Sequence, residues 1–440
     1  MIWVVAQAER VNGDLTVPGD KSISHRATLL GALATGETRI ANFLRSADCM
    51  ATIRCLRALG ITIEEGADTG EGVGRLVVHG RGLRGLQAPQ DVLDCGGSGT
   101  TMRLLAGILA GQSFACTLTG NEALRRRPMA RIIEPLRRMG ATIFGADGDR
   151  LPPLHIEGAA LHGIAYHLPV ASAQVKSALL LAALYAKGPT LLHEPAPSRD
   201  HTERMLKAMG ISLDTVGTQI VLDPAPTADK PLPPLDISVP GDLSSAAFFI
   251  VAACLLPDSS VRVRDVGVNP TRTGLLDVLR GMGAQIIVEN ERLVSGEPVA
   301  DIVARSSRLH GVTIGGDLVP RMIDEFPILA VAATQAEGIT YVRDAAELRV
   351  KESDRIAAIA SQLTRLGARI EERPDGFVIY GPTPLCGIEV DAHRDHRLAM
   401  SLAIAGLLAT GRTSIEGAES IPDSFPGFER QLGAIIARSV

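Results

Sequence analysis

The sequence predicts an α/β protein built from six similar repeats arranged in two halves. Three observations lead to this prediction. A six-residue motif occurs as Val17-Pro-Gly-Asp-Lys-Ser22 and, about half a chain later, as Val239-Pro-Gly-Asp-Leu-Ser244. A segment that ends in glycine and is followed by β-branched residues recurs along the whole chain. Between its copies lie segments that are apolar on every side, and a helix of that kind has to be buried.

The glycine pattern marks where one helix ends and a strand begins. Its form is Leu/Phe-x-x-Leu/Met-Gly, a glycine position that suits the residue just after a helix. The residues that follow are alternating or β-branched, as is typical of strands. We therefore expect a helix end and a new strand at Gly60, Gly140, Gly210, Gly283 and Gly367, and in a looser form a helix end at Gly433.

A second series of helices, nearly all apolar, interleaves with the first. Polar or Gly/Pro-rich residues precede almost every one. The predicted starts lie near Ser22, Thr100, Gln174, Ser244, Asp324 and Asp395. Each repeat should thus contain one buried helix, one amphipathic helix that covers it, and several short strands.

Six repeats in two halves predict two domains of three repeats each. We expect the first domain to span residues 19–236 and the second to combine residues 1–18 with residues 237–440. The proline-rich stretch 224–234 is typical of a linker. The chain would then cross between the domains twice, and a ligand cleft and hinge between them is the expected consequence. The crossings should lie near Pro18–Gly19 and near Asp236–Pro240.

The composition excludes several classes of function. The 440 residues carry a net charge of −5 and only 3% aromatic residues, so neither a positive field nor stacking platforms favour nucleic acid as a partner. The six cysteines show no CxxC pair and no metal-ligand spacing, as in reduced cytosolic proteins. No signal peptide and no membrane span are predicted, and we expect a cytoplasmic protein.

The first helix start has the chemistry of an anion site. Asp20 can cap this helix, which places Lys21, Ser22 and Arg26 in its first turns. The exposed N–H groups and the positive end of the helix dipole add to the two cations. A phosphate is the most natural ligand, and a solvated helix start is the alternative.

Three other clusters have a functional and a structural interpretation. Gly96-Gly97-Ser98-Gly99 before a helix lets the backbone approach a phosphate, or forms a plain turn. Lys351 and Arg355 would share one face of a helix that starts there, which is also a common structural charge pattern. Asp324 and Glu325 precede an apolar segment, where a carboxylate near a lysine is a general-base candidate or a simple cap.

The histidines give no sign of a metal site. His25, His201 and His396 are scattered without ligand spacing. We expect them to be hydrogen-bonding residues rather than metal ligands or nucleophiles.

Eight motifs occur in one order along the chain: Pro18-Gly-Asp-Lys-Ser-Ile-Ser-His-Arg26, Ser98-Gly-Thr-Thr-Met-Arg103, Arg127-Pro-Met129, Ser172-Ala-Gln-Val-Lys176, Ser198-Arg-Asp-His-Thr202, Ile323-Asp-Glu325, Arg349-Val-Lys-Glu-Ser-Asp-Arg355 and Asp395-His-Arg397. Over essentially its whole length the chain resembles the 5-enolpyruvylshikimate-3-phosphate synthases (3-phosphoshikimate 1-carboxyvinyltransferases) of the enolpyruvyl transferase family.

The resemblance implies a fold and a reaction. The fold is a two-domain inside-out α/β barrel, each domain having three βαβαββ units with buried helices. The reaction moves the enolpyruvyl group of phosphoenolpyruvate to the 5-hydroxyl of shikimate 3-phosphate by addition–elimination through a tetrahedral intermediate. It releases phosphate and serves chorismate and aromatic amino-acid synthesis. No metal or organic cofactor is implied, and a monomer with small-molecule substrates is expected.

The resemblance also implies roles for individual residues. The residues for shikimate 3-phosphate are Lys21, Ser22, Arg26, Ser172, Ala173, Gln174, Ser198, Arg199, Asp324 and Lys351. Those for phosphoenolpyruvate are Lys21, Gly99, Arg127, Gln174, Arg355 and Arg397. The proton-transfer candidates are Lys21, Asp324 and Glu352, with Asp324 expected as the base. The arginines would bind carboxylate and phosphate groups bidentately.

Four positions bear on how closely the chain follows the family pattern. Gly97 stands where many members have asparagine, Asp423 where some have lysine, and Glu347 where some have asparagine. Gly99 marks the position at which this family senses the herbicide glyphosate. Glycine leaves room there, so some sensitivity is expected.

Two other functions remain as alternatives. A UDP-N-acetylglucosamine enolpyruvyl transferase has the same architecture and carries a cysteine in the loop that corresponds to 121–127. This loop has no cysteine, and Cys116 lies upstream of it. A non-enzymatic anion-binding repeat scaffold is the alternative of another class.

Overall fold

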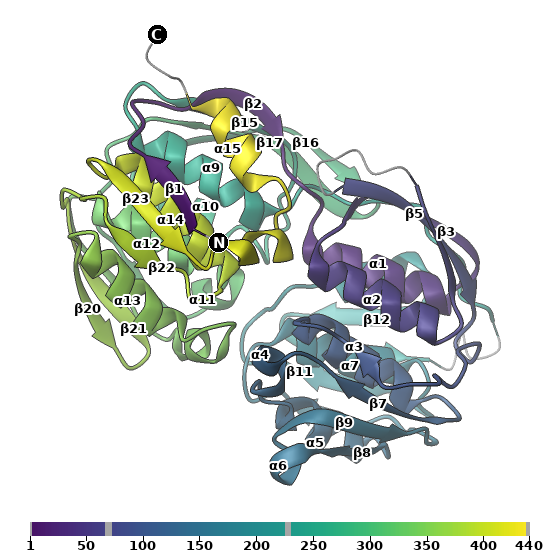
Figure 1. The fold of residues 1–440 in the computed structure, drawn as a ribbon. Helices are drawn as coiled ribbons and strands as arrows, with labels where there is room; N and C mark the ends of the chain where they lie inside the picture. The colour runs from purple at the N-terminus through teal and green to yellow at the C-terminus, as the bar shows by residue number, and fades with distance from the viewer. Residues whose placement is uncertain (1, 67–72, 225–229, 437–440) are drawn as a thin grey trace. The chain divides into compact units, whose positions relative to one another are not determined.

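The computed structural model describes residues 2–66, 73–224 and 230–436. The chain divides into two compact units (Figure 1). Unit 1 comprises Met1–Pro18, Pro240–Leu293 and Pro298–Val440, and unit 2 comprises Gly19–Val239 and Val294–Glu297.

Unit 2 contains three four-stranded sheets that share one pattern of pairing. The first pair of strands in each order is parallel and the other two pairs are antiparallel. The orders are β14(Ile237–Ser238)-β3(Thr35–Leu44)-β5(Val73–Arg81)-β4(Thr62–Glu65), β6(Leu93–Asp94)-β7(Ala115–Thr119)-β9(Leu151–Glu157)-β8(Thr142–Gly145) and β10(Ala165–His167)-β11(Thr190–His193)-β13(Gln219–Asp223)-β12(Ser212–Val216).

One helix of each repeat in unit 2 is buried and one covers it. The buried helices are α1 (Lys21–Leu33), α3 (Gly99–Ala110) and α7 (Ala173–Ala183). The amphipathic helices, buried on one side only, are α2 (Ala47–Ala58), α5 (Ala130–Arg138) and α8 (His201–Ala208). Two single-turn helices, α4 (Glu122–Arg125) and α6 (Ala146–Asp149), lie in loops. The buried helices and the inward faces of the sheets form one core.

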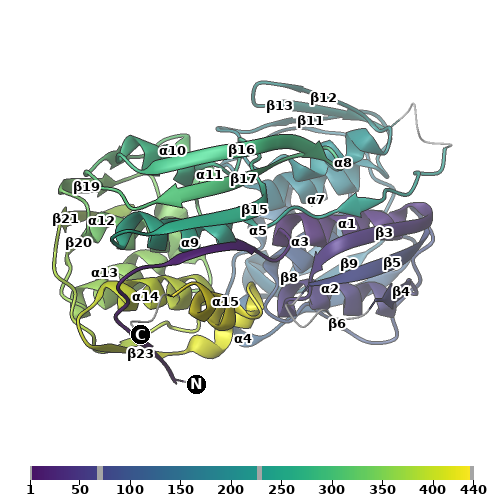
Figure 2. The same cartoon turned by 90° about the horizontal axis from the view of Figure 1, so that it is seen from above.

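Unit 1 repeats this plan with one sheet shortened. The orders are β2(Asn12–Thr16)-β15(Ser260–Gly267)-β17(Glu297–Arg305)-β16(Gln285–Val294), β18(Thr313–Ile314)-β19(Gly338–Val342)-β21(Gly376–Gly381)-β20(Arg369–Arg373) and the three-stranded β1(Ile2–Ala6)-β23(Arg412–Glu416)-β22(Glu389–Asp391). Figure 2 shows β2 lying beside β15.

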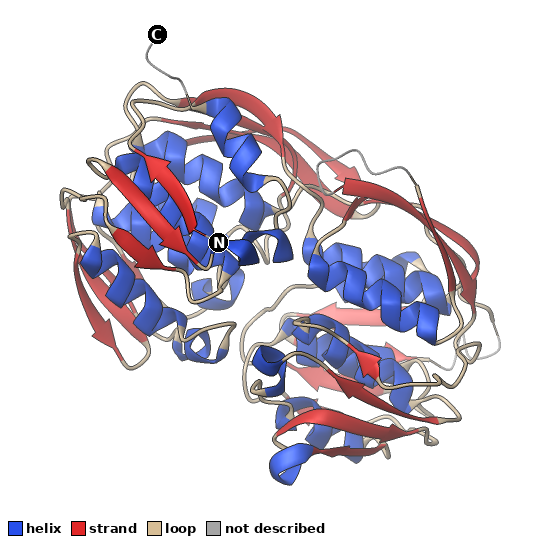
Figure 3. Cartoon of the chain, viewed as in Figure 1, coloured by secondary structure: helices blue, strands red, loops and turns tan. Residues whose placement is uncertain are grey.

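The helices of unit 1, drawn in blue like all helices in Figure 3, also form two classes by burial. Those buried along their length are α9 (Leu243–Leu255), α12 (Phe326–Thr334) and α14 (His396–Leu408). Those that cover them are α10 (Gly274–Gly281), α13 (Arg355–Arg365) and α15 (Phe428–Ile435). Short helical turns are α11 (Leu318–Arg321), η2 (Ala346–Val350) and η3 (Ala418–Asp423). The predicted α/β class with six buried helices is confirmed.

The duplicated motif follows an edge strand that belongs to a different unit from the helix after it. β2 pairs with β15 in unit 1 and leads into α1 of unit 2. β14 pairs with β3 in unit 2 and leads into α9 of unit 1. In both copies the aspartate caps the helix, Asp20 by accepting from Ile23 N and Asp242 by accepting from Ser244 N, each at 2.9 Å. The repeat therefore marks the boundaries between units at Pro18–Gly19 and at Val239–Pro240.

Five of the six predicted helix ends are confirmed. Gly60, Gly140, Gly210, Gly283 and Gly367 have positive φ between 80° and 104°, and each precedes a strand. The prediction at Gly433 is wrong, because α15 continues through it to Ile435. Ile435 is buried, and its side chain fills the space above Gly13 of β2. That packing extends the helix past the glycine.

No helix within residues 2–66, 73–224 and 230–436 combines the length and the apolar character needed to cross a lipid bilayer.

Gly107 and Gly433 form a matched pair for testing the close packing of the buried helices. A Cβ on Gly107 would lie 2.1 Å from the carbonyl oxygen of Ala178 in α7, whereas one on Gly433 meets no described atom within 4 Å. We expect Gly107→Ala to cost about 1–3 kcal/mol of stability through overpacking. Gly433→Ala should instead stabilise by about 0.5–1 kcal/mol, since alanine is the better helix former.

Calorimetric melting of both variants measures this difference. Equal melting temperatures for the two variants would contradict the assigned contact between α3 and α7.

Candidate functional site

Lys21 lies at the start of α1, as the sequence predicts. The Asp20 cap ends the preceding turn, and the Lys21 ammonium then lies 3.2 Å from Oδ2 of Asp48 in the first turn of α2. The two side chains are 16% and 17% exposed, so the pair is held firmly but remains reachable by a ligand. Asp48, which the sequence analysis missed, is 27 positions away and has no local signal.

Arg26 is directed into the protein. Its Nε donates to Thr202 Oγ1 and one terminal nitrogen to Ser177 Oγ, both at 2.7 Å, while the other donates to the Ser22 carbonyl at 2.9 Å. Burial lowers the pKa of Arg26 to about 10, although Glu203 opposes this. These contacts brace Ser22 and the start of α8 from inside.

Ser22 contacts a second, more exposed arginine. A terminal nitrogen of Arg199 donates to Ser22 Oγ at 3.2 Å, and both residues are half-buried. The structure therefore brings together Lys21, Ser22 and Arg199, which the sequence placed in separate motifs.

Gly99 lies between two guanidinium groups. Ser98 caps α3 by accepting from Thr101 N at 3.1 Å, which makes Gly99 the first residue of the helix. A Cβ on Gly99 would lie 2.8 Å from a terminal nitrogen of Arg103 and 3.0 Å from one of Arg127. The glycine-rich loop thus opens a helix, as predicted, and two cations adjoin it. Arg103 was visible at this helix start, but no role was predicted for it.

The start of α7 adjoins this loop. Ser172 caps α7, followed by Ala173 and Gln174. The Gln174 amide accepts a hydrogen bond from Arg103 and donates to Thr100 Oγ1 at 2.9 Å. Gln174 is therefore oriented by α3 and remains half-exposed.

Ser198 is engaged inside the protein. Its hydroxyl donates to the Glu194 carboxylate, and the Lys176 ammonium lies 2.7 Å from both Glu194 and Glu203. Burial would lower the pKa of Lys176, but the two carboxylates outweigh it and raise that pKa. This buried cluster supports the segment that carries Arg199.

Arg355 is the centre of the cluster in unit 1. Its guanidinium binds Asp395 through two bonds of 2.8 and 3.2 Å, Glu352 at 2.8 Å and Asp324 at 3.3 Å. Burial alone would lower the pKa of Arg355, but the three carboxylates raise it. Arg397 lies 3.9 Å from the other oxygen of Asp324. Asp324 is thus held between two arginines.

Lys351 and Arg355 do not share a helical face, contrary to the interpretation that a helix starts at Lys351. Asp354 caps α13 by accepting from Ala357 N, so the helix begins only at Arg355, and Lys351 has an extended conformation. Burial lowers the pKa of the Lys351 ammonium, while Asp324 and other carboxylates act in the opposite direction. A lysine with a lowered pKa is suited to proton transfer.

Glu325 is not a simple cap. Its buried carboxylate accepts from the hydroxyl of Ser244, which in turn accepts from Arg272 at 2.7 Å. Arg272 also donates to Asp242 at 2.9 Å. In the second copy of the motif, the serine at the helix start is therefore hydrogen-bonded to a carboxylate of the protein itself.

The positions that depart from the family pattern lie in three places. A Cβ on Gly97 would lie 3.2 Å from the amide nitrogen of Asn121, so the Asn121 side chain borders the space that glycine leaves. Asp423 ends η3, and Glu347 lies half-buried in η2.

His25 and His201 form hydrogen bonds, as expected. Nδ1 of His25 lies 2.7 Å from Thr52 Oγ1, and Nδ1 of His201 lies 2.8 Å from Glu297. Within the described residues, no group of three or more His, Cys, Asp or Glu side chains is arranged to hold a metal ion. All six cysteines are free thiols.

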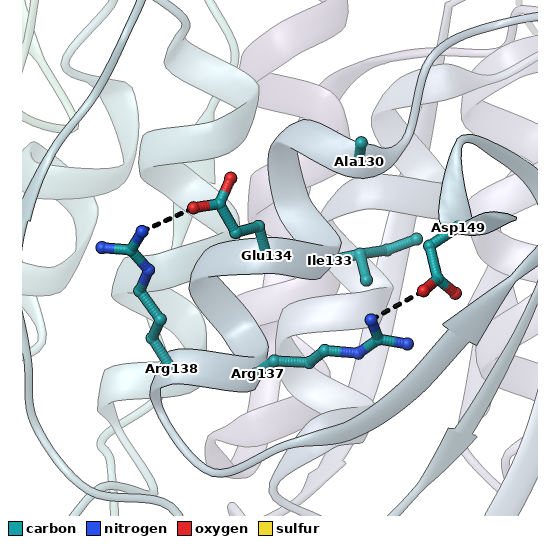
Figure 4. A pocket seen from close by; sticks show the side chains of 6 residues that line it. All are labelled: Ala130, Ile133, Glu134, Arg137, Arg138 and Asp149. Carbon is teal, nitrogen blue, oxygen red and sulfur yellow. Dashed lines mark hydrogen bonds and ion pairs between the residues drawn. The ribbon is translucent and has the colours of Figure 1, made fainter.

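A pocket of about 410 Å³ lies beside α5 (Figure 4). Its walls are two ion pairs, Arg137–Asp149 at 2.7 Å and Arg138–Glu134 at 2.6 Å, beside Ala130 and Ile133 of α5. None of the predicted site residues is among these lining residues.

Comparison with known proteins identifies the family of this chain. Residues 5–432 match the family model described as EPSP synthase (3-phosphoshikimate 1-carboxyvinyltransferase). The chain belongs to the EPSP synthase family. Proteins named 3-phosphoshikimate 1-carboxyvinyltransferase are 54% identical in Roseiflexus castenholzii and 50% in Desulforamulus reducens, each over 99% of this chain and 100% of the relative.

Solved structures agree in fold with this assignment. An EPSP synthase of Acinetobacter baumannii is 45% identical, with a TM-score of 0.86 over 99% of this chain and 98% of that one. The enolpyruvyl transferase NikO of Streptomyces tendae has a TM-score of 0.77 over 99% and 97% of the two chains, at 20% identity, and so shares the fold. The predicted EPSP synthase-like architecture is confirmed.

Asp395 and Asp14 differ in the environment of their ion pairs, which gives a pH test. Burial would raise the pKa of Asp395, but Arg355 keeps it below its usual value of 3.8. Its stabilising effect is therefore present above about pH 4 and is lost as the pH falls through the folded-state pKa. We expect Asp395→Asn to cost about 3–5 kcal/mol at pH 7, and less as the pH approaches and passes below 4.

Melting temperatures of Asp395→Asn and the exposed control Asp14→Asn, measured between pH 3 and 7, test this. The control should change little, because Asp14 pairs with Arg264 at the surface. A loss for Asp395→Asn that does not depend on pH would contradict the argument.

Proposed function

We propose that the protein transfers the enolpyruvyl group of phosphoenolpyruvate to the 5-hydroxyl of shikimate 3-phosphate, with release of phosphate. The observation that carries the proposal is the identity of 50–54% to proteins named for this reaction, over 99–100% of the chain. The serines and cations at the starts of α1 and α3 support it, because both substrates are anions. The product would enter chorismate and aromatic amino-acid synthesis.

Unit 2 would bind shikimate 3-phosphate through the starts of its buried helices. Lys21, Ser22 and Arg199 form one group around α1, and Ser172 with Gln174 forms another at α7. Ala173 would contribute its backbone. Arg26 and Ser198 would act by bracing these groups, since their side chains are already hydrogen-bonded inside the protein. Asp324 and Lys351 of unit 1 would bind the ring hydroxyls.

Phosphoenolpyruvate would use cations from both units. Gly99 with Arg127, and Gln174, are the candidates in unit 2, and Arg355 and Arg397 are those in unit 1. A guanidinium pairs with carboxylate or phosphate through two parallel hydrogen bonds. Lys21 would contact this substrate as well.

The proton transfers need a base and an acid. In the addition step, the base takes the proton of the 5-hydroxyl while an acid protonates the methylene carbon of phosphoenolpyruvate, giving the tetrahedral intermediate. In the elimination step, that carbon returns a proton and phosphate leaves. Asp324, held at 3.3 Å from Arg355, is the proposed base, and Lys21 and Glu352 are the other candidates.

The remaining expectations also form part of the proposal. We propose a cytoplasmic monomer that works on these two small molecules without a metal, an organic cofactor or a nucleic-acid partner.

The cysteine that the alternative, a UDP-N-acetylglucosamine enolpyruvyl transferase, would need is absent from the loop 121–127. Cys116 lies on β7, and burial raises the pKa of its thiol to about 12. A thiol with that pKa is a poor nucleophile or acid at neutral pH.

Lys21→Met and Asp324→Ala test the assigned chemistry. We expect phosphate release from the two substrates in the unchanged protein and a loss of at least about 100-fold in kcat for either variant, since general acid–base groups contribute about 10²–10⁴-fold. A coupled phosphate assay measures both. Asp149→Ala, which removes a carboxylate of the pocket on α5, is the matched control and should keep full activity.

Retained melting temperatures would show that the fold survives. Near-normal turnover in Lys21→Met or Asp324→Ala would contradict the roles, and no phosphate release from the unchanged protein would overturn the function.

Gly99→Ala tests the phosphoenolpyruvate contacts. The new methyl group would meet terminal nitrogens of Arg103 and Arg127 at 2.8 and 3.0 Å and displace them. We expect a KM for phosphoenolpyruvate raised about tenfold or more, with a smaller change for shikimate 3-phosphate, and weaker inhibition by glyphosate. Steady-state kinetics with each substrate varied in turn measure this. An equal rise in both KM values would argue against a specific role.

A further inference from the structure

A chain of buried hydrogen bonds joins the N-terminal halves of three helices in unit 2. Nδ1 of His25 in α1 lies 2.7 Å from Thr52 Oγ1 in α2, and Thr52 Oγ1 lies 2.7 Å from Thr101 Oγ1 in α3. The Thr101 hydroxyl then donates to Ser98 Oγ at 2.8 Å. All four residues have no exposed surface. The candidate roles described above use none of the first three.

The direction of the chain follows from the neutral imidazole of His25. Burial holds the pKa of His25 well below its usual value, and Lys21 and Arg26 lower it further, so the ring carries one proton. Nε2 has no hydrogen-bond partner in the described part of the chain. A buried N–H without a partner is rarer than an acceptor without one, which assigns the proton to Nδ1. His25 then donates to Thr52, Thr52 to Thr101, and Thr101 to Ser98.

Both ends of the chain reach residues of the candidate site. Ser98 caps α3 immediately before Gly99, and it accepts from both the backbone N and the hydroxyl of Thr101. At the other end, His25 lies one turn after Lys21 on α1. The Thr101 hydroxyl also lies 3.5 Å from the carbonyl of Asp48, the partner of Lys21.

We propose that His25, Thr52 and Thr101 are positioning residues, which hold the glycine-rich loop at Ser98–Gly99 in a fixed place relative to the start of α1. The proposal rests on the proposed function, because the loop and Lys21 are its candidate phosphoenolpyruvate contacts. The side chains of His25, Thr52 and Thr101 are fully buried, so they would act on the loop and not on substrate. Their effect is geometric, and a misplacement of 1 Å at such a contact costs on the order of 100-fold in rate.

Hydrogen-bond chains of this kind are strong only when every member is satisfied. Removing the central hydroxyl leaves His25 without an acceptor and Thr101 without its donor. The substitution would remove only the hydrogen bonds from Thr52 in α2 to His25 in α1 and to Thr101 in α3. The loop should therefore shift or become mobile, while the rest of the core stays packed.

Thr52→Val and Thr28→Val form a matched pair for the test. Both threonines are fully buried, and both substitutions remove one hydroxyl. The hydroxyl of Thr28 donates only to the Ser24 carbonyl within α1, at 2.9 Å. A purely structural role predicts similar losses for the two variants. Positioning predicts that only Thr52→Val changes the loop.

We expect Thr52→Val to lower kcat/KM for phosphoenolpyruvate about tenfold and to change kcat/KM for shikimate 3-phosphate by less than about threefold. Thr28→Val should leave both within about twofold, and Thr52→Ser, which restores the hydroxyl, should recover most of the loss. Equal effects of the two valine variants on phosphoenolpyruvate would overturn the proposal.

A second readout does not depend on catalysis. Hydrogen exchange of the amides of residues 99–102, measured by mass spectrometry without substrate, should be about tenfold faster in Thr52→Val than in Thr28→Val. If the unchanged protein shows no enolpyruvyl transfer, the proposed function fails, and this exchange difference still decides the positioning. If Thr52→Val does not fold, Thr101→Ala takes its place, with the same expected results. Unchanged exchange in the folded variant would overturn the proposal.

Discussion

The burial of six helices along their length is the constraint on which the rest of the structure depends. A helix that is apolar on every face offers only its ends for polar chemistry, and the first N–H groups there need acceptors. Side chains of Asp20, Ser98, Ser172, Asp242 and Asp395 supply them at five of the six starts. The dipole makes the same ends attractive to anions. Stability and anion chemistry therefore use the same positions.

Most of the fold could be predicted because its signals are local. The left-handed glycine that ends a helix, at Gly60 and at four later positions, can be recognised from the few residues on either side of it. The prediction at Gly433 failed because the position where α15 ends depends on residues that are distant in the sequence. Ile435 of α15 packs against Gly13, and the last sheet takes its antiparallel strand β1 from the N-terminus. The glycine pattern carries no information about either contact.

The site could be predicted in part for the same reason. The positions of Lys21 and Gly99 at helix starts could be predicted because a cap or a loop directly precedes them. Side-chain pairing between helices gave no such signal, so Asp48 was missed and the three carboxylates around Arg355 were not foreseen. The helix assigned to Lys351 was wrong for a local reason. Asp354 is itself a capping residue and sets the start of α13 four residues later.

The two copies of the motif separate the geometry of an anion site from its charge. Both copies present a capped helix start and a serine that accepts from an arginine. In the second copy the Glu325 carboxylate binds the serine, Arg272 compensates its charge, and Leu243 stands where the first copy has Lys21. In the first copy Arg199 donates to Ser22, and the neighbouring Lys21 pairs with Asp48. The capped turn is therefore common to both copies, whereas the charged groups around its serine differ.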